Sequence, residues 1–102
     1  MIFVIATIEL VEGRRDEFLW AFNELIPEVR KEPGCIEYGP TVDLETNIPS
    51  QGPMRENVIT VIEKWESIEA LEEHLVAPHM FEYRKKAQDV VVKTTLQVLE
   101  PA

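Results

Sequence analysis

The chain has 102 residues, 45% of them hydrophobic, which predicts a single small domain spanning residues 1–102. Nineteen acidic residues against ten basic ones give a net charge of −9, which argues against nucleic acid or an anionic membrane surface as a partner. The single cysteine, Cys35, excludes an intrachain disulfide, and the apolar residues 1–6 are too few for a signal peptide or membrane span. We therefore expect a cytoplasmic protein.

The first two elements are a strand and a helix. Residues 2–11 are nearly all apolar and β-branched, which is typical of a central strand covered on both faces. After Gly13 the period becomes helical, and residues 14–32 carry one hydrophobic stripe: Phe18, Leu19, Phe22, Leu25, Ile26 and Val29. Trp20 lies about 160° from the centre of this stripe by the 3.6-residue period. It is either incidental there or part of a subunit contact.

The next segment alternates and then becomes irregular. Residues 35–44 predict a strand with one apolar face: Ile36, Tyr38, Val42 and Leu44. Pro40 indicates that this strand is an edge strand or is bulged. Residues 45–56 show no periodicity, so they form either a lid or binding loop, or a surface loop without a role.

The second half of the chain predicts a strand, two short helices and a last strand. The strand at residues 57–66 places four residues on one face: Ile59, Val61, Glu63 and Trp65. Ser67 is a good N-cap for a helix with a buried stripe made by Ile68, Leu71 and Leu75. Pro78 suits the first position of another helix, which runs to about residue 88, and residues 90–100 form the last strand.

This order, β-α-β-β-α-β, predicts an α+β ferredoxin-like fold. Right-handed crossovers give a four-stranded antiparallel sheet with helices on one face. The first and third strands are apolar on both faces, so the open face needs a cover. A second sheet from a symmetry mate supplies one, and we expect a homodimer.

Two histidines are the natural candidates for acid–base chemistry. His74 and His79 lie five residues apart, which on one continuous helix separates them by about 140°. They do not form a metal-binding pair, so we expect no metal, and the glycine-rich nucleotide motifs are absent. His74, on the flank of its helix, is a candidate general base or else a structural residue.

The third strand offers candidates for ligand binding. If its Glu63 and Trp65 face lies opposite the helices, both look into a cavity between two sheets, where Trp65 can stack on a flat ligand. Otherwise Trp65 fills the core or the dimer contact. Tyr38, Met54 and Met80 are candidate pocket walls, with core packing or a solvent-exposed hydroxyl as the alternative.

Several motifs resemble those of the antibiotic biosynthesis monooxygenase (ABM) family. E-P-G-C-I-E-Y at residues 32–38 is similar to that family's helix-to-strand junction. I-E-K-W-E-S-I-E-A-L-E-E-H-L-V-A-P-H-M at residues 62–80 resembles its second signature. The resemblance spans essentially the whole chain. Y-x-P-x-V-D at residues 38–43 and L-x-P at residues 99–101 point to bacterial quinol monooxygenases that oxidise menadiol.

The resemblance implies a dimeric α+β barrel that oxidises or monooxygenates a small aromatic quinol with dioxygen and without a cofactor. Family members often use a strand tryptophan and a helix histidine, which match Trp65 and His74, and His79 is a weaker candidate. Ala6 and Thr7 stand where haem-degrading relatives have an asparagine, which counts against haem. The alternatives are a non-catalytic dimer that binds an aromatic metabolite and an isomerase of a small signalling oxo-compound.

Overall fold

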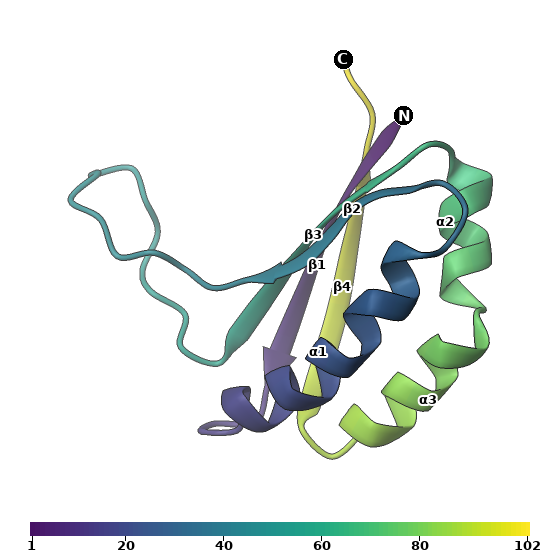
Figure 1. Ribbon diagram of the computed structural model, residues 1–102. Helices are drawn as coiled ribbons and strands as arrows, with labels where there is room; N and C mark the ends of the chain where they lie inside the picture. The colour runs from purple at the N-terminus through teal and green to yellow at the C-terminus, as the bar shows by residue number, and fades with distance from the viewer.

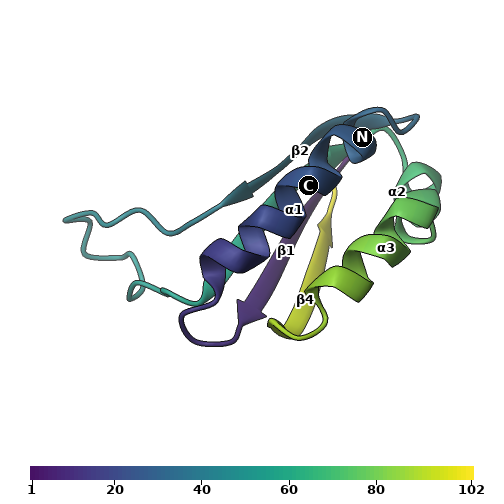
Figure 2. The ribbon, with the colours of Figure 1, turned by 60° about the horizontal axis from the view of Figure 1, so that its bottom comes forward.

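The computed structural model describes residues 1–102. Its elements follow the predicted order, with two short helices in the second crossover (Figure 1): β1 (Ile2–Leu10), α1 (Arg15–Arg30), β2 (Cys35–Thr41), β3 (Val58–Trp65), α2 (Ile68–Leu75), α3 (Pro78–Ala87) and β4 (Val91–Leu99). The strands form one antiparallel sheet in the order β2-β3-β1-β4. All three helices lie on the same face of this sheet (Figure 2). The predicted ferredoxin-like fold is confirmed.

The strand β2 lies at the edge of the sheet, as Pro40 indicates. Its pairing with β3 is also irregular, because the register shifts between Cys35 and Glu37. This shift changes the pattern of buried residues: Tyr38 is buried, whereas Ile36 is 44% exposed. The prediction that Ile36 shares one apolar face with Tyr38 was therefore wrong.

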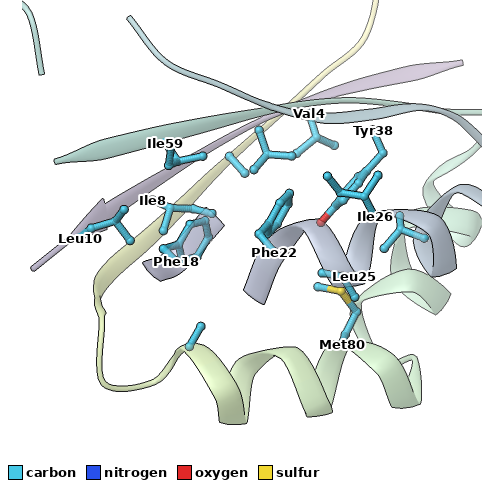
Figure 3. Packing of buried hydrophobic residues seen from close by; sticks show 14 of the residues in the cluster. Val4, Ile8, Leu10, Phe18, Phe22, Leu25, Ile26, Tyr38, Ile59 and Met80 are labelled. Carbon is cyan, nitrogen blue, oxygen red and sulfur yellow. The ribbon is translucent and has the colours of Figure 1, made fainter. Parts of the chain in front are cut away.

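The core fills the layer between the sheet and the helices. Every second residue of β1 from Val4 to Leu10 points inward, and α1 supplies Phe18 and Phe22 from its predicted stripe (Figure 3). On β3 the buried face is the predicted one: Ile59, Val61, Glu63 and Trp65. This face looks toward the helices and not toward the open side of the sheet. Any site that uses Glu63 therefore lies between sheet and helices.

The face of the sheet opposite the helices is only partly apolar. Phe3 and Ile5 of β1 are half-buried, Ile62 of β3 is exposed, and two threonines, Thr7 and Thr60, pair across the same strands. The expectation of two apolar faces is met at one end of the strands and not at the other. None of the three helices has the length and hydrophobicity that crossing a membrane requires.

The helix α2 begins as predicted, and its buried face is the predicted one in part. The Ser67 hydroxyl accepts a hydrogen bond from the Ala70 backbone N–H at 3.2 Å, which is the geometry of an N-cap. The buried residues of the helix are Leu71 and His74, whereas Ile68 is exposed. Of the predicted stripe, Leu71 is buried and Leu75 packs against the core, so only Ile68 was placed wrongly, and His74, expected on the flank, belongs to the buried face. The His74 side chain is buried, and it is hydrogen-bonded to the carboxylate of Glu32.

The β2–β3 connection projects from the body of the protein as a long arm, residues 42–57 (Figures 1 and 2). The Arg55 guanidinium closes its base by donating to both carboxylate oxygens of Asp43, at 2.7 and 2.8 Å. The arm carries four exposed hydrophobic side chains: Val42, Leu44, Ile48 and Met54.

Candidate active site

A cavity of about 300 Å³ lies between the sheet and the helices, and all seven elements contribute to its wall. This volume is at the lower end of the range for small-molecule sites. Most of the wall is apolar, with aromatic and aliphatic side chains that include Ile8, Phe22, Val61, Met80 and Leu96. The polar groups include the ionisable side chains of Glu63 and His74 and the hydroxyls of Tyr38 and Tyr83. The cavity therefore suits a small, mostly apolar ligand with a polar group to be held or deprotonated.

His74 is the candidate base that is best placed in this wall. Its side chain is almost fully buried, and Nδ1 donates a hydrogen bond to Glu32 Oε2 at 2.9 Å. Because a carboxylate only accepts, this bond keeps the proton on Nδ1 and leaves Nε2 as the free acceptor. Nε2 has no partner in the protein, and no enclosed polar side-chain atom lacks one, so Nε2 borders open space. Burial lowers the pKa of His74, which keeps the ring neutral and able to accept a proton.

His79 binds the same carboxylate from the other side. Its Nε2 donates to Glu32 Oε2 at 2.8 Å, although His79 does not line the cavity. The separation of 140° holds for a continuous helix, but the helical conformation is interrupted at Val76 and Ala77, between α2 and α3. The break lets both histidines reach one oxygen. No group of three or more His, Cys, Asp or Glu side chains is arranged to hold a metal ion.

Trp65 lies behind His74 and is fully buried, so its ring forms no part of the cavity surface. The indole ring packs against the His74 ring in a tilted arrangement, with centroids 4.7 Å apart and an angle of 37° between the planes. Its Nε1–H donates to Glu63 Oε1 at 2.9 Å. Trp65 therefore fixes the orientation of two ionisable neighbours and does not offer a stacking face to a ligand.

Glu63 is a buried acid in the cavity wall. It is 5% exposed and sits on β3 between Val4 of β1 and Tyr38 of β2. Burial raises its pKa from the ordinary 4.5 to about 7, the nearby Glu32 raises it further, and the hydrogen bond from Trp65 opposes the rise. A carboxyl group with this pKa changes charge close to neutral pH.

The remaining predicted pocket residues separate into two groups. Tyr38 and Met80 line the cavity, and burial raises the pKa of Tyr38 so that its hydroxyl stays protonated. Met54 lies on the exposed arm and does not reach the cavity, and no residue of the 45–56 loop does. Within the protomer that loop is not a lid.

Three residues of the site were not predicted from the sequence: Glu32, Tyr83 and Arg84. Glu32 follows the C-terminal end of α1, where the helix dipole disfavours a negative charge. An acid in that position is a signal that it serves another partner, here the two histidines. Tyr83 and Arg84 line the cavity from α3, but nothing in their spacing separates them from surface residues of a short helix.

Comparison with known proteins identifies the family. The family model "Antibiotic biosynthesis monooxygenase" (ABM) matches residues 1–86. The chain belongs to the ABM family. It is 38% identical over 103 residues to "Probable quinol monooxygenase YgiN" of Escherichia coli, covering 99% of this chain and 98% of that relative. It is also 29% identical over 92 residues to the uncharacterized protein sll1783 of Synechocystis, covering 90% of this chain and 56% of the relative.

Solved structures share the ABM fold. A conserved protein from Methanosarcina mazei superposes with a TM-score of 0.83 at 25% identity, covering 99% of this chain and 92% of its own. A crystal structure described as an antibiotic biosynthesis monooxygenase gives a TM-score of 0.81 at 22% identity, covering 100% and 99%. The resemblance to the ABM family inferred from the motifs is confirmed over nearly the whole chain.

Proposed function

We propose that this ABM protein oxidises or monooxygenates a small aromatic hydroquinone with dioxygen, without a bound cofactor. The observation that carries the proposal is the Glu32–His74 pair, in which a carboxylate fixes Nδ1–H and leaves Nε2 free beside an apolar cavity. The relative named as a probable quinol monooxygenase supports the substrate class.

The chemistry requires a base and an enclosed space. Removal of a hydroxyl proton by His74 Nε2 turns a hydroquinone into an anion, which gives up electrons more readily. Apolar walls exclude water, so the anion meets dioxygen in a protected environment. Two electrons passed to dioxygen give a quinone and hydrogen peroxide. Insertion of one oxygen atom into the ring gives a hydroxyquinone and water. In both reactions the substrate supplies all the electrons.

The walls of the cavity fit a flat ligand. Phe22 and Tyr38 stack on each other with ring centroids 5.7 Å apart and an angle of 21° between the planes, and both residues line the cavity. Aromatic ligands gain from offset or edge contacts with such rings. In this proposal, Phe22 and Tyr38 hold the substrate ring, Met80 adapts to its outline, and Trp65 positions His74 and Glu63 from behind.

Oxygen uptake tests the function. Metal-stripped protein is mixed with menadiol in an oxygen electrode, and the uncatalysed autoxidation rate is subtracted. We expect faster uptake than in the blank, and catalase distinguishes the products because it returns half of the oxygen only when peroxide forms. Binding of menadiol without uptake would instead identify a non-catalytic binder. Isomerisation of an oxo-compound without oxygen consumption would identify an isomerase.

We further propose that the protein is a homodimer packed through the open face of its sheet. Phe3, Ile5, Ile62 and Leu99 place hydrophobic side chains on that face, which no helix covers. Packing two such faces completes an α+β barrel. Sedimentation at micromolar concentration should give twice the protomer mass of 11.8 kDa, and a stable monomer would contradict the proposal.

A further inference from the structure

One ionisable residue of the cavity has no part in the base mechanism. Glu63 is buried on β3, and the only hydrogen bond of its side chain in the protein is the one that Oε1 accepts from the Trp65 indole. Oε2 has no partner and, like His74 Nε2, is not enclosed, so it borders open space. Because Glu63 lines the same cavity as His74, a ligand that fills the cavity meets both groups.

The surroundings of Glu63 favour its protonated form. From β2 the neutral Tyr38 faces it, from α2 the neutral His74, and Glu32 adds a negative charge from the end of α1. On α3, Tyr83 is neutral, while Arg84 donates to the Leu75 carbonyl oxygen at 2.8 Å and forms no ion pair. β1 and β4 contribute only uncharged residues to the wall. An acid buried without an ion-pair partner stays neutral or titrates near neutral pH.

A purely structural role does not explain an acid at this position. The bond to Trp65 needs only one acceptor oxygen, which a glutamine supplies without the cost of burying an ionisable group. The property that glutamate adds is exchange of a proton. A carboxyl group whose pKa lies near 7 exchanges it at the pH where a neutral histidine base also works.

We propose that Glu63 is a second proton-transfer residue of this site, donating a proton to reduced dioxygen and accepting the second hydroxyl proton of the hydroquinone. This rests on the hydroquinone oxidation proposed above. His74 takes the first hydroxyl proton, two electrons pass to dioxygen, and Glu63 protonates the resulting peroxide. The second hydroxyl proton then returns to Glu63, and the proton on His74 completes hydrogen peroxide. A quinone and hydrogen peroxide leave, and both residues regain their starting states.

The test compares Glu63→Gln with wild type, using Glu37→Gln, an exposed acid on β2, as the matched control. Steady-state oxygen uptake with menadiol is followed between about pH 5 and pH 9. Wild type should lose activity as the pH rises through about 7, where Glu63 loses its proton. Glu63→Gln should lack this alkaline limb and lose about 10²-fold or more in kcat, with little change in KM. Glu37→Gln should behave as wild type.

Infrared spectroscopy supplies a measurement that does not depend on turnover. At about pH 6 wild type should show the C=O band of a protonated carboxyl group, which disappears at about pH 9 and is missing in Glu63→Gln. A wild type that consumes oxygen while Glu63→Gln keeps its kcat and alkaline limb would overturn the role of Glu63. So would absence of the band. A wild type with the band but without oxygen uptake would instead overturn the proposed function.

Discussion

Replacing Glu63 by glutamine should change how the stability of the protein depends on pH. Burial raises the pKa of Glu63 from 4.5 to about 7, so the folded protein holds this proton more tightly than the unfolded chain does. The stability that the proton contributes is fully present below about pH 4.5 and is lost as the pH rises through about 7. At 1.36 kcal/mol for each pKa unit, the loss amounts to about 3 kcal/mol.

Glutamine does not titrate, and its side-chain oxygen still accepts the Trp65 N–H. The free energy of unfolding of Glu63→Gln minus that of wild type should therefore rise by about 3 kcal/mol between about pH 5 and pH 9. Urea unfolding at fixed protein concentration, followed by tryptophan fluorescence, measures this difference. The Glu37→Gln control should give a constant difference, because Glu37 is exposed. A difference for Glu63→Gln that stays equally flat would refute the reasoning.

Three further predictions follow from the neighbours of the cavity. His74→Ala should lower kcat about 10²–10⁴-fold with the far-UV circular dichroism retained, and the acidic limb of the wild-type pH–rate profile should lie below about pH 6.5, because burial lowers the pKa of His74. Glu32→Gln should lower kcat and move that acidic limb to still lower pH, since Glu32 raises the pKa of His74; an unmoved limb in the pH–rate profile would count against the pair. Gly34→Ala should destabilise the protein by more than about 1 kcal/mol in urea, because φ is +87° and the new Cβ would lie 2.6 Å from Ala70 Cβ. Gly13→Ala, with φ of +77° but open space around it, is its control and should cost less.

The fold was predictable because it depends on local patterns. Alternation along β3 identifies the buried face that carries Glu63, and helical spacing places Trp20, which is 74% exposed, outside the stripe of α1. The N-cap at Ser67 was predictable because it depends only on Ser67 and the three residues that follow it. The exposure of Ile36 was not predictable, because it depends on a register shift in the pairing of β2 with β3, and the sequence of β2 alone does not indicate that shift.

The site was only partly predictable because its decisive bonds join distant residues. His74 as a candidate base and Glu63 as a pocket residue follow from residue type and strand face. The bond from His74 to Glu32 spans 42 positions, so the residue pattern of neither helix reveals it. The full burial of Trp65 likewise depends on the packing of α2 over the sheet, so a ligand-stacking role could not be separated from a positioning role.

The shared carboxylate of Glu32 joins the two halves of the helical crossover, since His74 belongs to α2 and His79 to α3. Through Glu32 Oε2, the position of α3, which forms part of the cavity wall, is thus coupled to the protonation of His74. A ligand that shifts α3 as it enters alters the His79–Glu32 bond, and with it the proton affinity of His74. Thermodynamic linkage makes this reciprocal, so protonating His74 must change the affinity for that ligand by the same factor. For a quinone that shifts α3 on binding, fluorescence titration should therefore give a pH-dependent Kd, even though the quinone has no ionisable group.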